Sequence, residues 1–262
     1  MPTLVLSHRY SPDSNALFAA ALAADWDVER LRSFRCPDGL AAREPVVYGE
    51  TILADAIAGD LGIVLLEPTA DWLPRLPRRH RLRDVRLTTL ADALTIRERA
   101  FVKPTDEKCF PARVYADGAA IDPDPVLPPD LPVLVSEPVV FEVEFRCFVL
   151  EREVAALSPY IRGGEIARSA AGDWEADPAE VDAAFASIRA VLGDADVELP
   201  PAVVVDVGRM AGRGWGVVEA NPAWASGLCG CDPARVLPVL RRATVASSVA
   251  SAADRRWGRQ VG

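Results

Sequence analysis

The sequence has little lysine and little histidine. Of 29 lysine and arginine residues only two are lysine, and the 262-residue chain has two histidines. It offers no Ser-His-Asp or Cys-His arrangement, which argues against an activated side-chain nucleophile. Both lysines lie within six positions, at Lys103 and Lys108. A compact ammonium fits beside a phosphate oxygen where a planar guanidinium does not, so the pair predicts a phosphate site, although codon composition alone can also enrich arginine.

Further absences bound the class of protein. The five cysteines are odd in number and have no C-x-x-C spacing, which predicts reduced thiols and a cytoplasmic location. No stretch approaches the ~20 apolar residues of a membrane span. The net charge is −9 and the basic segment 75–86 is interrupted by leucine and proline. We therefore expect neither a membrane nor a nucleic acid as partner, while an oligomer stays open.

Residues 1–82 alternate between short apolar runs and helix-like segments. This alternation predicts a small α/β domain with a parallel sheet. A proline-spaced basic segment that begins at Leu73 is the expected linker to the rest of the chain. The expected strands are residues 4–7, 27–31, 46–48 and 63–66, and the expected helices are one capped near Ser14 and one over 50–61.

From Arg83 the sequence changes to apolar strands joined by loops. Residues 141–150 and 154–157 predict one hairpin, and residues 202–207 and 215–220 predict a second. We expect helices over 178–192 and 232–250. The predicted boundaries are a domain over 1–82, a lobe with the lysine strand over 83–137, a lobe with the acidic hairpin over 138–250, and a frayed tail over 251–262.

Three oxygen-bearing side chains lie on the second predicted hairpin. Asp206 and Glu219 are on consecutive strands, and Asn221 shares a strand face with Glu219. Carboxylate and amide oxygens are hard ligands suited to Mg²⁺, which binds one or two protein carboxylates when phosphates complete its shell. The alternative is that both acids face solvent. Because the flanking residues are apolar, we favour a metal site.

Four sequence pieces resemble, in order, the ATP-grasp fold of carboxylate-amine ligases over residues 83–230. They are Phe-Val-Lys103-Pro, similar to the phosphate-binding strand; Ser-Glu137-Pro-Val, similar to the hinge between lobes; Glu144, which matches the ribose-binding acid; and Asp206 with Glu219-Ala-Asn-Pro, similar to the Mg²⁺ motif. Glu144 to Phe148 and the lysine pair look most like the compact R-to-K clade. The resemblance implies an α/β (α+β) fold: a small N-terminal α/β pre-ATP-grasp domain, then a two-lobed ATP-grasp fold with antiparallel sheets.

The resemblance implies that the protein binds ATP with Mg²⁺. Lys103 and Lys108 would neutralise the phosphates, and Glu144 would hold the ribose hydroxyls. At the hinge, Glu137 would accept the adenine amino hydrogen, and backbone groups at Pro138 and Val139 would pair with the ring.

The sequence departs from the family pattern at three places. No lysine precedes the lysine strand, and Arg83 and Arg86 are the nearest cations. The glycine-rich loop after the strand is missing, and we expect Lys108 to replace it by charge. Val204 stands where many members carry an arginine, so Arg146 or Arg209 would have to stabilise a developing oxyanion.

Two further segments are candidate substrate sites. Tyr160 and Arg162 could hold a substrate carboxylate, although an exposed Tyr-Ile-Arg loop without function is the alternative. Ser226 and Gly227 follow the acidic hairpin and, by resemblance, would line the acceptor site. A simple turn explains these two residues equally well.

The activity that the resemblance implies is ATP-dependent carboxylate-amine ligation through an acylphosphate, with release of ADP and phosphate and formation of an amide or peptide-type bond. The partners are then a small-molecule or peptide carboxylate and an amine. The alternatives are an enzyme that modifies a peptide or protein, a kinase of the same fold, and a nucleotide-binding module without turnover.

Overall fold

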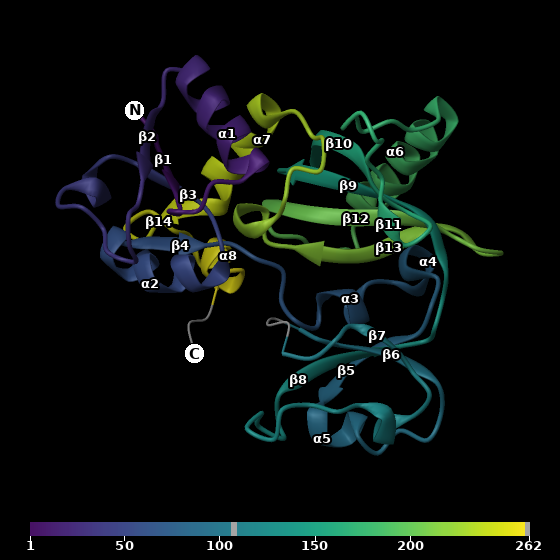
Figure 1. Ribbon diagram of the computed structural model, residues 1–262. Coiled ribbons are helices and arrows are strands. Elements are labelled where there is room, and N and C mark those ends of the chain that lie inside the picture. Colours follow the sequence, from purple (N-terminus) through teal and green to yellow (C-terminus); the bar gives the residue numbers. More distant parts are fainter. Residues whose placement is uncertain (106–108, 260–262) are drawn as a thin grey trace.

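The computed structural model describes residues 1–105 and 109–259. Lys108, predicted to replace the glycine loop, lies outside the described residues. Three bodies are visible in Figure 1: an N-terminal domain, a large sheet beside it, and a small sheet below them. Within the described residues, no helix is long and apolar enough to cross a membrane.

The N-terminal domain contains a three-stranded parallel sheet of order β2-β1-β3, as the alternation predicted. Every residue of β1 and β3 is buried. The first helix is capped within the predicted Ser-Pro-Asp-Ser14 segment: Ser11 is the N-cap and forms a capping box with Ser14. The elements are β1 (Thr3–Leu6), α1 (Pro12–Ala23), β2 (Asp27–Arg30), η1 (Leu40–Ala42), β3 (Pro45–Tyr48) and α2 (Thr51–Leu61).

The next strand does not join that parallel sheet. Instead β4 (Ile63–Leu65) pairs antiparallel with β14 (Thr244–Ala246), so one strand of the predicted parallel layer was assigned wrongly. Helix α7 (Pro233–Ala243) ends seven residues before the predicted end at 250 because the chain continues as β14. The β-branched Thr244 and Val245 suit that strand.

The C-terminal segment folds back on the N-terminal domain (Figure 1). Helix α8 (Ala252–Arg256) starts with a capping box at Ser251, and Trp257 is 4% exposed. Arg259 pairs with Asp55 of α2 and with Glu67. The prediction of a frayed tail was therefore wrong for residues 251–259, whose apolar and charged side chains find partners far away in the sequence.

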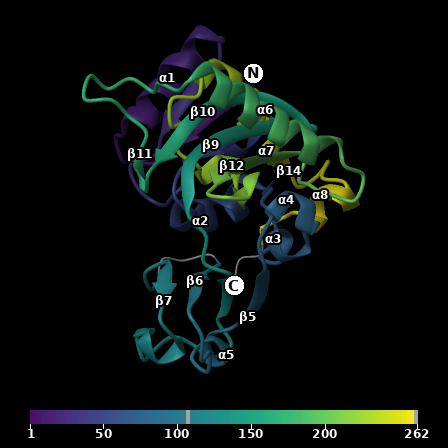
Figure 2. The same ribbon diagram turned by 90° about the vertical axis from the view of Figure 1, so that its right-hand side faces the viewer.

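A short helical linker leads into the small sheet. This sheet is antiparallel, of order β5-β8-β6-β7, and packs its own core around Val102, Val133 and Phe110. Figure 2 shows it set apart from the other bodies. The elements are α3 (Trp72–Arg75), α4 (Arg78–Arg81), β5 (Val85–Thr89), α5 (Leu90–Ala93), β6 (Ala100–Pro104), β7 (Arg113–Tyr115), η2 (Gly118–Ala120) and β8 (Pro132–Ser136).

The large sheet is antiparallel, of order β11-β10-β9-β12-β13, and contains both predicted hairpins. Its odd-numbered residues on β9 and β12, such as Phe145 and Val205, pack with α6. Even-numbered Phe148 and Val204 pack with α7 and the N-terminal domain. The elements are β9 (Phe141–Leu150), β10 (Glu153–Arg162), β11 (Glu165–Ile166), α6 (Pro178–Gly193), β12 (Ala202–Met210), β13 (Gly214–Asn221) and η3 (Ala223–Ala225).

Candidate active site between the two sheets

A cavity of about 180 Å³ lies between the small and the large sheet. Most of its wall is apolar, and a few charged groups converge on it, which is the usual make-up of a small-molecule site. The apolar wall consists of Leu73, Val85, Phe101, Leu134, Val139, Phe141 and Val218, and the polar groups are Arg83, Lys103, Ser136, Glu137, Glu144 and Glu219.

Lys103 reaches across this cavity. It stands near the end of β6 in the small sheet, and its ammonium donates to Oε2 of Glu219 on β13 of the large sheet. Asn221, two residues on, donates from Nδ2 to the other oxygen of Glu219 at 3.0 Å. Burial alone would raise the pKa of Glu219, but Lys103 and Asn221 lower it to about 2. Glu219 is therefore ionised at neutral pH.

A second ion pair is buried beside the first. Asp206 is 0% exposed and accepts two hydrogen bonds from Arg146, at 3.0 Å from Nε and 2.7 Å from Nη2. The two residues are cross-strand neighbours on β12 and β9. Burial raises the pKa of Asp206, and the Arg146 guanidinium opposes that shift. The ring of Tyr160 lies 4.1 Å from the guanidinium carbon of Arg146 and adds a cation–π contact.

The predicted metal ligands Asp206, Glu219 and Asn221 are brought together by the register of β12 and β13. Their oxygens fit Mg²⁺, since a cation that also binds phosphate needs few protein ligands. Both oxygens of Asp206 are, however, engaged by Arg146. The described residues contain no group of three or more His, Cys, Asp or Glu that could hold a metal. Glu219 and Asn221 are thus the more accessible ligands.

Arg83 is 5% exposed and forms part of the cavity wall. Its guanidinium donates to the carbonyls of Val217 at 2.6 Å and Val218 at 2.7 Å. Burial lowers its pKa to about 10, so it stays charged at neutral pH. Arg83 therefore holds β13 in place and adds positive charge beside the cavity.

Glu144 projects from the same face of β9 as Arg146, two residues away. Burial is the main cause that raises its pKa, and the nearby carboxylates of Asp206 and Glu219 raise it further, to about 7. The raised pKa makes Glu144 sensitive to pH near neutrality. A carboxyl whose pKa is shifted by burial and charged neighbours in a cavity is typical of a functional site.

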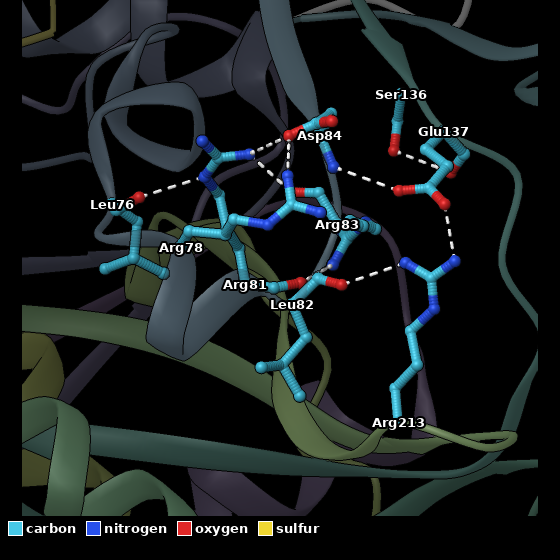
Figure 3. Close-up of polar contacts among 9 residues, drawn as sticks. All are labelled: Leu76, Arg78, Arg81, Leu82, Arg83, Asp84, Ser136, Glu137 and Arg213. Carbon is cyan, nitrogen blue, oxygen red and sulfur yellow. Dashed lines mark hydrogen bonds and ion pairs between the residues drawn. The ribbon is translucent and has the colours of Figure 1, made fainter.

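Glu137 lies at the hinge between the two sheets (Figure 3). The carboxylate of Glu137 accepts from Arg213 and from the Asp84 amide, and the hydrogen bond with Arg213 is the main cause that lowers its pKa to about 2. This carboxylate is therefore held against the hinge, and the role of Glu137 as acceptor for an adenine amino group stays a prediction. Val139 borders the cavity, and its main-chain amide has no hydrogen-bond partner among the described residues.

Comparison with known families identifies this arrangement. The model of the ATP-grasp domain of the R-to-K clade, family 2, matches residues 80–239, more than half of the chain. The chain belongs to this ATP-grasp family. The predicted resemblance and the two-lobed fold with antiparallel sheets are thereby confirmed.

Solved structures share the ATP-grasp fold at low sequence identity. A RimK domain protein ATP-grasp from Sphaerobacter thermophilus DSM 20745 aligns with a TM-score of 0.51 and 16% identity over 92% of this chain and 98% of that one. The D-cycloserine synthetase DcsG aligns with a TM-score of 0.52 and 14% identity over 92% and 98% of the two chains. No curated protein matches the sequence.

The loop after the acidic hairpin of this ATP-grasp chain lies against Arg146. The carbonyl of Gly227 accepts from Nη1 of Arg146 at 3.2 Å, while the Ser226 hydroxyl donates to the Pro222 carbonyl at 2.7 Å. Asp13 of α1 accepts from the amide of Leu228 at 2.9 Å. No sequence pattern pointed to Asp13, because this contact joins residues that are 215 positions apart.

Two predicted residues of the ATP-grasp site point elsewhere. Arg209 pairs with Glu142 and with Glu180 of α6, and Arg162 also pairs with Glu180. Both arginines therefore lie on the α6 side of the large sheet, which is opposite to the face that carries Asp206. The structure therefore favours Arg146 over Arg209 as the oxyanion-stabilising residue, and Tyr160 over Arg162 as a residue near the site, while all four roles stay predictions.

Proposed function

We propose that this ATP-grasp protein is an ATP-dependent carboxylate-amine ligase that acts through an acylphosphate. The observation that carries the proposal is the cavity between the two sheets, where Lys103, Glu144 and Glu219 converge beside the buried Arg146–Asp206 pair. Its apolar wall suits a nucleobase. Its charged side chains suit a triphosphate with a bound metal ion: Lys103 for the phosphates and Glu219 for the metal.

ATP then lies with its base beside Val139 and its ribose near Glu144. Lys103, which contacts Glu219 in the structure, would bind a phosphate oxygen, and Glu219 and Asn221 would hold Mg²⁺. The metal supplies charge neutralisation at the phosphates. Arg83, already hydrogen-bonded to β13, keeps positive charge close to them.

In the proposed reaction a carboxylate oxygen of the first substrate attacks the γ-phosphorus, and the bond to the β-γ bridging oxygen breaks to release ADP. An amine attacks the resulting acylphosphate, loses a proton and displaces phosphate. Arg146 is the cation best placed to stabilise the tetrahedral oxyanion, because its guanidinium is fixed by Asp206 and by the Gly227 carbonyl. Tyr160 covers one face of that guanidinium.

The test is nucleotide release in the presence of a panel of carboxylates and amines. We expect ADP and phosphate, rather than AMP, only when a carboxylate and an amine are both present. Formation of AMP, or full turnover by Glu219→Ala, would contradict the scheme. Turnover with a carboxylate or alcohol alone would indicate a kinase.

A second experiment separates the remaining alternatives. Intact-protein and peptide mass spectra, recorded after incubation with cell extract and ATP, would show a mass increase if the substrate is a peptide or protein. Tight ATP binding in calorimetry with no ADP formed from any substrate would favour a nucleotide-binding module. The cytoplasmic location and the absence of a nucleic-acid partner stay predictions.

A further inference from the structure

A single arginine at the tip of the β12–β13 hairpin contacts the hinge. Gly212 and Gly214 have φ angles of 72° and 92°, in the left-handed region that glycine adopts without strain. They flank Arg213, whose amide donates to the Met210 carbonyl at 3.1 Å. The turn is thereby shaped so that Arg213 extends toward the segment that joins α4 to β5 (Figure 3).

Arg213 makes two contacts there. It donates to the Leu82 carbonyl at 3.0 Å and to the carboxylate of Glu137. These two residues lie on different connections between the lobes, one before β5 and one after β8. The guanidinium of Arg213 therefore joins the large sheet to both of the connecting segments that form the hinge.

The carboxylate of Glu137 is the shared element of this contact. Its other oxygen accepts from the Asp84 amide at 3.3 Å, and the amide of Glu137 donates to the Asp84 carbonyl at 2.9 Å. The Ser136 hydroxyl donates to the Glu137 carbonyl at 3.0 Å. The main chain just before Val139 is thus held on several sides, and Arg213 supplies the charge that keeps the Glu137 carboxylate turned to the hinge.

We propose that Arg213 is a positioning residue for the nucleobase: it holds Glu137 against the hinge, and so fixes the main-chain edge at 137–139 that borders the cavity. This inference rests on the proposed ATP binding. Neither contact of Arg213 is to a residue that we place at the phosphates, so its effect is confined to the base.

Close packing supports a rigid connection at this point. A Cβ atom at Gly216 of β13 would lie 2.9 Å from the His80 carbonyl oxygen and 3.3 Å from the Leu82 side chain. The hairpin thus rests directly on the linker that Arg213 contacts. An exposed ion pair on a flexible segment would contribute little, whereas one on closely packed elements can fix a neighbouring backbone.

The test compares two ligands that share phosphates but not a base. Calorimetry with Mg²⁺ is run with ATP and with inorganic triphosphate on the wild type, Arg213→Ala, Glu137→Gln and the double variant. We expect each single substitution to weaken ATP binding about tenfold, while binding of triphosphate changes less than about twofold. The double variant should bind ATP no more weakly than Arg213→Ala, because both substitutions remove the same contact.

The matched control is Arg241→Ala, which removes an exposed arginine of α7 that pairs with Glu44, away from the cavity. Its melting temperature and that of Arg213→Ala should be similar, and its ATP affinity should equal that of the wild type. Unchanged or tighter ATP binding in Arg213→Ala, or equal weakening of ATP and triphosphate, overturns the inference. A wild type that binds no ATP overturns the proposed function instead.

Discussion

The two sheets that border the cavity supply their charges in different ways. In the large sheet, Arg146 and Asp206 are paired at two atoms by the register of adjacent strands and are closed to solvent. The small sheet supplies Lys103, whose side chain is 23% exposed and contacts one carboxylate of the other lobe. The first pair is fixed by the fold, whereas the second can exchange partners.

This difference assigns different tasks to the two lobes. A buried charge that loses its partner is costly, so Arg146 and Asp206 must stay together. A partly exposed pair is worth little to stability, so Lys103 can leave Glu219 for a phosphate at small cost. Under the proposed function, the large sheet would provide a preorganised charge environment, and the small sheet would provide a cation that exchanges Glu219 for a phosphate.

The largest expected effect comes from Arg146→Ala. It leaves Asp206 buried without a partner, so the free energy of unfolding should fall by about 3–5 kcal/mol, measured by urea denaturation at pH 7.5. Removing both side chains in Arg146→Ala, Asp206→Ala should destabilise less than Arg146→Ala alone, because no charge is left unpaired. A loss below about 1 kcal/mol would mean that the pair resembles an exposed one and would remove the contrast between the sheets.

Lys103→Ala should separate binding from stability. We expect the free energy of unfolding to fall by less than in Arg146→Ala, because the Lys103–Glu219 pair is partly exposed whereas Arg146–Asp206 is buried. The dissociation constant for ATP with Mg²⁺ should rise by at least about a hundredfold, because the cation for the phosphates is lost. Equilibrium calorimetry and urea denaturation measure the two quantities.

Lys103→Arg tests why lysine is used at this position. The guanidinium keeps the charge and can still pair with Glu219, so stability should match the wild type, while ATP binding stays weaker. If Lys103→Arg binds ATP as tightly as the wild type, the phosphate site does not require lysine, and codon composition is sufficient to explain why lysine is scarce in this chain. Lys108→Ala, outside the described residues, is predicted to slow turnover more than binding.

A smaller effect is expected from the pH dependence of Glu144. Its pKa rises from 4.5 to about 7 on folding, so the folded state holds the proton more tightly. The carboxyl therefore makes the free energy of unfolding fall as pH rises from about 4.5 to 7, with no further change above that range. Glu144→Gln should remove this slope, so the variant gains stability relative to the wild type between pH 5 and pH 8.

Urea denaturation at both pH values measures the change. Glu142→Gln is the matched control, since Glu142 is exposed on the same strand and pairs with Arg209 outside the cavity. If the free energy of unfolding depends on pH equally in the wild type and in Glu144→Gln, then Glu144 is solvated in the folded state, as the exposed Glu142 is. The large sheet would then lack one of the partly buried ionisable groups that distinguish it from the small one.

The sequence was sufficient where neighbouring residues decide the structure. Alternation of apolar and charged side chains located the first hairpin of the large sheet, and apolar runs on either side of a glycine-containing turn located the second. The spacing of Glu219 and Asn221 placed them on one strand face. Pairings over long distances were not predictable. Strand β4 joins β14, which follows far later in the chain, and the contact between Asp13 and Leu228 depends on how two domains pack.

The roles of individual side chains were harder to predict than their positions. Glu137 lies at the hinge as expected, but its carboxylate is held by Arg213, an arginine in a turn that no sequence pattern singled out. Arg209 could have been judged from strand alternation, because it lies three residues from Asp206 and so on the opposite face. A sequence motif therefore predicts the position of a residue, whereas the hydrogen-bond and ion-pair partners that limit its role are known only from the structure.

The smallest effect is expected from Arg209→Ala. Its ion pairs with Glu142 and Glu180 are exposed or partly exposed and lie on the α6 side of the sheet, so stability should change by less than about 1 kcal/mol. If Arg146 alone stabilises the oxyanion, kcat for ligation should stay within about twofold of the wild type, against a loss of about a hundredfold or more in Arg146→Lys. Arg146→Lys keeps the charge but cannot bind Asp206 at two atoms. If Arg209→Ala loses as much activity as Arg146→Lys, then residues on the α6 face of the large sheet take part in the reaction. The buried Arg146–Asp206 pair would then not be the feature that gives the large sheet its catalytic role.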